Sequence, residues 1–187
     1  MESVSSMKIS VHPSLILWIS VLFYLDETVL IPFLLAAGLH ELGHYFVLRF
    51  MKKPPLAIVL SFSGARMETS SLSYSEELIA AAAGPAVSLL LTFVFPLWPA
   101  LAVYSLILGC FNLLPIPGLD GGRILSCLLL MHLHEDAARR ICKYFAIVTA
   151  LSLWGIALYL TGPMQFGLWP ILVAALFLYK ALSMDTL

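Results

Sequence analysis

Residues 28–50 read TVLIPFLLAAGLHELGHYFVLRF, a nearly continuous apolar stretch in the first third of the chain. A helix needs about 20 apolar residues to cross a bilayer, so this stretch is long enough to do so. Apart from Glu41 and two histidines, its only residue with a charged side chain is Arg49, near its end. The stretch therefore predicts a transmembrane helix that carries ionisable side chains in its second half.

Those side chains form the sequence His40-Glu41-Leu42-Gly43-His44. On a helix, HExxH places two imidazoles one turn apart on the same face, with a carboxylate beside them. This geometry suits a zinc ion bound by both histidines, with Glu41 placed to take a proton from the activated water. The alternative is a pair of structural histidines, one of them paired with Glu41. Ionisable groups inside a membrane span are costly and usually functional, which favours the metal site.

The composition indicates an integral membrane protein. Of its 187 residues 61% are hydrophobic and only 11% are charged, and the mean hydropathy is +0.98. A water-soluble domain cannot bury that much apolar surface. The net charge of −1 gives no indication of a charged partner. We expect the lipid bilayer as a partner and no nucleic acid.

The apolar runs predict an all-α polytopic membrane protein with six transmembrane segments. Their approximate bounds are 9–25, 28–50, 77–95, 98–133, 144–160 and 166–182. The first is short for a span. We expect residues 1–187 to form one membrane-embedded domain, with its catalytic core at about 28–134 and no separate soluble regulatory domain.

Basic residues test this arrangement. Of the ten Lys and Arg residues, all but Arg123 fall on one side of the six-span arrangement, and the opposite side receives only Asp26 and Glu27. The positive-inside rule then places both termini in the cytoplasm and the histidine motif in the cytoplasmic half of the bilayer. We expect the chain to reside in a bacterial cytoplasmic membrane.

Residues 56–69 differ from the helical segments. They contain β-branched and aromatic residues, a short alternating stretch and Gly64, which favour a strand or hairpin. Pro54-Pro55 prevents the preceding helix from continuing into this region. A small membrane-associated β-hairpin or sheet is therefore predicted after the second span. An ordinary interfacial loop is the alternative.

A catalytic zinc usually takes three protein ligands, so a third ligand is needed. Residues 111–122, FNLLPIPGLDGG, interrupt the fourth segment with two prolines and three glycines. Irregular backbone inside a membrane is tolerated where protein buries it or water reaches it, so this break is expected to line a wet cavity faced by Asp120. Asn112 offers a donor amide on the same stretch. Alternatively, Asp120 only caps the following helix, and Gly121 and Gly122 provide flexibility.

These elements together resemble the site-2 protease family of intramembrane zinc metalloproteases, peptidase family M50. The resemblance is carried by His40-Glu41-Leu42-Gly43-His44, by Ala83-Gly84-Pro85, and by Asn112-Leu113-Leu114-Pro115 followed by Leu119-Asp120-Gly121-Gly122. Val11-His12-Pro13 and the six-span layout look like the branch that contains the sporulation stage IV protease. Gly118 replaces the proline usual before Leu-Asp-Gly in that family, which leaves the path of the loop open.

The resemblance implies one zinc ion per chain, bound by His40, His44 and Asp120, with Glu41 as general base. It implies that Asn112 holds the substrate or stabilises the oxyanion. The implied substrate is a transmembrane or membrane-tethered protein, which adds as a strand to the region 56–69. Because no fused regulatory domain is expected, membrane adaptor or inhibitor proteins are expected to regulate cleavage.

Two other functions remain open. A different membrane zinc protease would cut soluble or prenylated tails and would use a glutamate, Glu76 or Glu77, as its third ligand. A membrane metal transporter or metal-binding protein would use the His/Asp site for transport or storage. A transporter needs metal ligands along a path through the membrane, and the outer half of this chain offers only Asp26 and Glu27.

Overall fold

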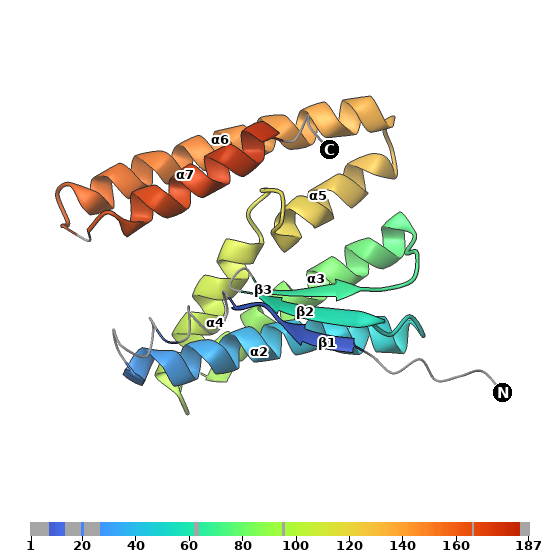
Figure 1. Ribbon diagram of the computed structural model, residues 1–187, viewed down its shortest axis with the longest axis horizontal. Coiled ribbons are helices and arrows are strands. Elements are labelled where there is room, and N and C mark those ends of the chain that lie inside the picture. The colour runs from blue at the N-terminus through green and yellow to red at the C-terminus, as the bar shows by residue number, and fades with distance from the viewer. Residues whose placement is uncertain are drawn as a thin grey trace. The chain divides into compact units, whose positions relative to one another are not determined.

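The computed structural model describes residues 8–13, 20, 27–61, 64–94, 96–165 and 167–183. The chain divides into two compact units, Met1–Phe111 and Asn112–Leu187. Helices account for most of the described residues, and one small sheet lies in the first unit (Figure 1).

Helix α2 carries the histidine motif and runs from Glu27 to Phe50, as the apolar stretch predicts. Its end is fixed locally. Lys52 takes a left-handed backbone conformation with φ 61°, and the N–H of Lys53 donates to the carbonyl of Leu48 at 3.0 Å. A helix commonly ends in this way, with a left-handed residue and a bond back into the last turn. Pro54-Pro55 then prevents further helix.

Helix α3, Tyr74–Leu91, begins at a capping box. The backbone N–H of Ser73 donates to the Glu76 carboxylate at 2.8 Å, and the Ser73 hydroxyl accepts from the Glu76 N–H. The ammonium of Lys53 bonds to that carboxylate at 2.8 Å and to the carbonyl of Ser71 at 2.8 Å. The end of α2 is therefore tied to the start of α3, which sets how the two helices pair.

The sheet has the strand order β1-β2-β3. Strand β2, Ala57–Ser61, pairs antiparallel with β3, Gly64–Glu68, which confirms the predicted hairpin. Strand β1, Lys8–Val11, pairs parallel with β2. The prediction that a membrane helix starts at residue 9 is therefore wrong, because this backbone bonds to β2 instead. Of the remaining predicted segment up to residue 25, all but 12, 13 and 20 lies outside the described residues.

A single 3₁₀ turn, η1, Thr92–Val94, follows α3, and helix α4 then runs from Pro99 to Asn112. Phe33 of α2 meets Tyr104 of α4 edge to face, with ring centroids 6.2 Å apart. Gly109 lies against α3, since a Cβ there would be 3.0 Å from Cβ of Ser88. Helices α2, α3 and α4 thus pack around one another in the first unit.

The predicted interruption of the fourth segment is confirmed, because α5 begins only at Asp120 and ends at Leu130. Gly118 has φ +89°, a conformation that proline cannot adopt, so the departure from the family pattern at this position gives the loop its own path. A Cβ on Gly121 would overlap the carbonyl group of Leu113. Gly121 therefore serves close backbone approach rather than flexibility.

Helices α6, Glu135–Thr161, and α7, Trp169–Leu182, lie side by side in the second unit (Figure 1). Their contact is made by small buried residues, Ala146, Ala150 and Ala181, which let the helices approach closely. Helix α6 starts well before the predicted boundary at residue 144. Acidic residues in a first turn are favourable at a helix N-terminus, but they are not hydrophobic, so the apolar run did not predict this part of α6.

Among the described residues, three helical stretches are long and apolar enough to cross a membrane: Leu30–Phe50, Tyr74–Val94 and Glu135–Thr161. The apolar helices α4 and α7 are shorter. The described residues are thus mostly helical with one small sheet, as predicted, and three of their helices could cross a membrane. The count of six spans stays a prediction.

Candidate metal centre

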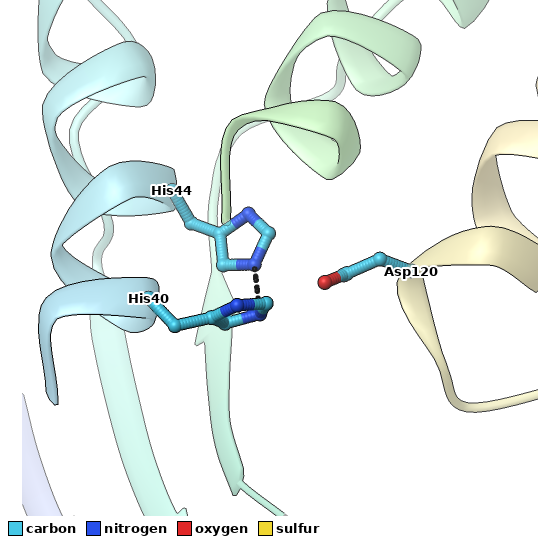
Figure 2. Close-up of side chains that lie close together, drawn as sticks. All are labelled: His40, His44 and Asp120. Atoms are coloured by element: carbon cyan, nitrogen blue, oxygen red, sulfur yellow. Dashed lines mark hydrogen bonds between the residues drawn. The ribbon is translucent and has the colours of Figure 1, made fainter. Parts of the chain in front are cut away.

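The two histidines of the motif lie one turn apart on α2 and are both buried. His40 is 3% exposed and His44 is 8% exposed, and their ring centroids are 5.0 Å apart. Figure 2 shows both imidazoles pointing away from α2 on the same side, as the i, i+4 spacing requires.

Each ring is held through its Nδ1 atom by helix α3. Nδ1 of His44 lies 2.7 Å from the carbonyl oxygen of Ala80. A carbonyl can only accept a hydrogen bond, so this Nδ1 carries a proton, and in the neutral imidazole Nε2 is left with a lone pair. Nδ1 of His40 lies 2.9 Å from Oγ of Ser88. Contacts of this kind orient metal-binding histidines and select their tautomer.

The two Nε2 atoms approach each other to 3.3 Å, along the dashed line in Figure 2. Gly84 of α3 lies beside them: an added Cβ would be 2.6 Å from Nε2 of His40 and would overlap Nε2 of His44. The glycine therefore leaves space where both donor atoms converge. Two imidazole nitrogens around such a space form a donor set that suits zinc.

The residues of α3 that serve this pair follow one another at four-residue intervals: Ala80, Gly84 and Ser88. The sequence drew attention to Ala83-Gly84-Pro85 as a close-packing element, and the approach of Gly84 to the imidazoles agrees with it. Ser88 and the carbonyl of Ala80 were missed. Ser88 follows Gly84 by four residues, and this spacing could have indicated that it lies on the same face of the helix. The carbonyl of Ala80 belongs to the backbone, so no side chain in the sequence indicates its role.

Asp120, in the second unit, is the first residue of α5, is buried, and has its Oδ1 atom 3.6 Å from Nη1 of Arg123. The N-cap of α5 is Leu119, so the interpretation of Asp120 as the helix cap is wrong. The carboxyl group is drawn at the start of α5 in Figure 2. An acidic side chain in a first helical turn interacts favourably with the helix dipole.

The other two predicted site residues, Glu41 and Asn112, lie on helices α2 and α4. Glu41 lies on α2 between the histidines and is half-buried, and Asn112 is the last residue of α4 and is also half-buried. Glu76, the alternative third ligand, is already bonded to Ser73 and Lys53. That carboxylate has a structural role at the start of α3, which argues against a role as a metal ligand.

Comparisons with known proteins agree with this chemistry. Residues 94–156 match the model of peptidase family M50. A zinc metalloprotease from Methanocaldococcus jannaschii is 34% identical over 106 residues, which cover 49% of this chain and 31% of the relative. The chain thus spans about a third of that relative's length.

A solved structure, the site-2 protease from Methanocaldococcus jannaschii, is similar over nearly the whole chain. The TM-score is 0.66, and the match covers 99% of this chain and 94% of the other, at 24% sequence identity. At this identity the likeness establishes a shared fold. The small sheet and the helices described above therefore belong to one known architecture.

Proposed function

We propose that this protein, a member of peptidase family M50, is an intramembrane zinc metalloprotease that hydrolyses a peptide bond of a membrane protein. The observation that carries the proposal is the imidazole pair. Both Nδ1 atoms have partners on α3, and both Nε2 atoms converge beside a glycine. A pair of structural histidines would not need that space.

One zinc ion per chain would be held by Nε2 of His40, Nε2 of His44 and the carboxylate of Asp120. Two imidazoles and one carboxylate form a ligand set known from catalytic zinc sites, which keep one position open. Asp120 is a buried carboxylate in the first turn of α5 and belongs to the Leu-Asp-Gly-Gly element of the family resemblance, which supports its assignment. When bound, zinc supplies the Lewis acid needed for peptide hydrolysis.

The side chains around the metal would carry the proton transfers. Glu41 takes a proton from the attacking water and returns it to the leaving amine. Asn112 donates its amide N–H to the oxyanion that develops on the scissile carbonyl or holds the substrate. These roles follow from the HExxH spacing and from the family resemblance at Asn112.

The proposed substrate is a transmembrane or membrane-tethered protein that is cut in the cytoplasmic half of the bilayer. A helical substrate hides its carbonyls in internal hydrogen bonds, so it must unwind locally before hydrolysis. Adaptor or inhibitor proteins of the membrane would regulate such cleavage. The resemblance to the sporulation branch, carried by Val11-His12-Pro13, stays a prediction.

We propose further that both termini lie in the cytoplasm of a bacterial cell. The one-sided distribution of Lys and Arg supports this orientation. A cysteine added at the N-terminus should resist a membrane-impermeant thiol reagent in intact cells and react after lysis. Reaction in intact cells would place the N-terminus outside the cytoplasm and contradict the proposed orientation.

Substitution of the general base tests the proposed function. Wild type and Glu41→Gln are expressed in the same host, and new protein N-termini in the membrane fraction are identified by mass spectrometry. We expect new N-termini inside apolar segments with wild type, and cleavage lower by about 10²- to 10⁴-fold with Glu41→Gln. The variant should keep its zinc, since Glu41 is not a ligand.

The matched control is Glu135→Gln, which removes an exposed carboxylate at the start of α6 and should leave cleavage unchanged. Equal cleavage by wild type and Glu41→Gln would end the assignment of Glu41. Zinc flux into proteoliposomes that is the same for both would support the metal transporter instead, a function that the comparisons do not favour.

A further inference from the structure

A fully buried serine contacts one of the two histidines, and the proposed proton transfers do not involve it. Ser88 of α3 is 0% exposed, and its Oγ atom lies 2.9 Å from Nδ1 of His40. Burying a hydroxyl is costly unless it is hydrogen-bonded. The contact with His40 on α2 therefore offsets the cost of burying the Ser88 hydroxyl on α3.

The two histidines are held by partners of different kinds. The carbonyl of Ala80 can only accept, so His44 carries its proton on Nδ1. A serine hydroxyl can donate or accept, so His40 can carry its proton on either nitrogen. The 3.3 Å separation of the Nε2 atoms fits a hydrogen bond donated by His40 to His44.

We infer that Ser88 is a positioning residue that keeps a hydrogen bond to Nδ1 of His40 both without and with the metal. Without metal, the Ser88 hydroxyl donates to Nδ1, and Nε2–H of His40 donates to His44. With metal, Nε2 of His40 would give its proton to water and Nδ1 would take one from water, so that Nδ1–H donates to Oγ of Ser88 and the Nε2 lone pair is left for the metal. Apart from this exchange of one proton with water, only the hydrogen of the Ser88 hydroxyl has to turn. This inference rests on the proposed function, because it concerns the same metal.

The surroundings of Ser88 explain why the side chain is small. Gly109 of α4 packs against it, and a Cβ at Gly109 would lie 3.0 Å from Cβ of Ser88. A larger polar residue would push α4 away from α3. Alanine fits the same space, so Ser88→Ala removes the hydroxyl with little change in packing.

Zinc affinity of the purified full chain, measured by competition with a chelator, tests the inference. Ser88→Ala should bind zinc about ten- to a hundredfold more weakly, since it removes the acceptor for Nδ1–H of His40. The control is Ser105→Ala on α4. It removes a hydroxyl that is also 0% exposed and has no hydrogen-bond partner in the described part of the chain. Its affinity should equal that of wild type.

Wild-type affinity in Ser88→Ala, or equal losses in both variants, would overturn the role of Ser88. If wild type itself binds no zinc, the proposed function fails and this role fails with it. The two failures are thus distinguishable in one titration.

Nitrogen NMR of the wild-type chain, labelled at histidine, gives a readout that needs no Ser88 variant. Of the five histidines, His40 and His44 are identified by single substitutions. Without zinc, His44 should show Nδ1–H and His40 should show Nε2–H. Zinc should move the His40 proton to Nδ1 and leave the His44 tautomer unchanged. A His40 proton on Nδ1 in both states would overturn the inference.

Discussion

At the scale of single residues, the histidine pair depends on what α3 presents to it. HExxH fixes the spacing of the imidazoles, but it fixes neither their tautomers nor the space between them. The carbonyl of Ala80 determines the tautomer of His44, and Gly84 keeps side-chain atoms away from both Nε2 nitrogens. The proposed zinc site therefore depends on two helices, although the sequence motif lies on one.

Gly84→Ala should lose most of its bound zinc, while its thermal unfolding midpoint should fall only modestly. The added methyl group would fill the space beside Nε2 of His40 and His44. Overpacking costs about 1–3 kcal/mol, and the imidazoles would have to move apart to relieve it. The control is Gly38→Ala on α2, where an added Cβ meets nothing within 4 Å. Metal analysis and thermal unfolding of both variants check this. A Gly84→Ala chain that keeps its full zinc content would contradict the placement of the metal.

At the scale of elements, the loop before α5 determines where Asp120 lies. Ile116 is fully buried, and its N–H donates to the carbonyl of Leu114 at 2.8 Å. The N–H of Leu119 donates to the carbonyl of Ile116 at 3.1 Å. The interrupted segment is therefore a compact turn that holds the start of α5 in a defined position.

Gly121→Ala should destabilise the protein, although alanine is the better helix former. On propensity alone, alanine in α5 would gain about 1 kcal/mol over glycine. The added Cβ would overlap the backbone carbonyl of Leu113, so the turn would have to move, and we expect a net loss of about 1–3 kcal/mol. Gly155→Ala on α6, with nothing within 4 Å, should be neutral or stabilising. Thermal unfolding in detergent measures both; a higher midpoint for Gly121→Ala would show that the turn does not need glycine there.

Elements whose signal is local were predictable from the sequence. The apolar run and Pro54-Pro55 gave α2 within a residue of its bounds, and the prolines and glycines gave the interruption before α5. Strand β1 was missed because its partner, β2, lies far along the chain and the pairing is parallel. The early start of α6 was missed because hydropathy detects the lipid-facing part of a helix and not its polar first turns.

At the scale of the whole molecule, the predicted ligands come from two units of the chain. The histidines belong to the first unit and Asp120 to the second. The match to peptidase family M50, residues 94–156, contains Asp120 and Asn112 but not the histidines. The sequence could name these candidate ligands because each motif is local; that they bind one metal stays a prediction. The residues that tune them, such as Ser88, become visible only when α2 and α3 are placed side by side.

The central claim is that Asp120 binds the same zinc ion as His40 and His44. The zinc content of variants tests this claim most directly. Zinc per chain is measured by mass spectrometry on purified wild type, Asp120→Ala and Glu77→Ala, the last to remove the rival ligand. We predict one zinc per chain in wild type and Glu77→Ala, and its loss in Asp120→Ala, because two imidazoles alone hold a catalytic zinc poorly. Wild-type zinc content in Asp120→Ala would contradict the claim.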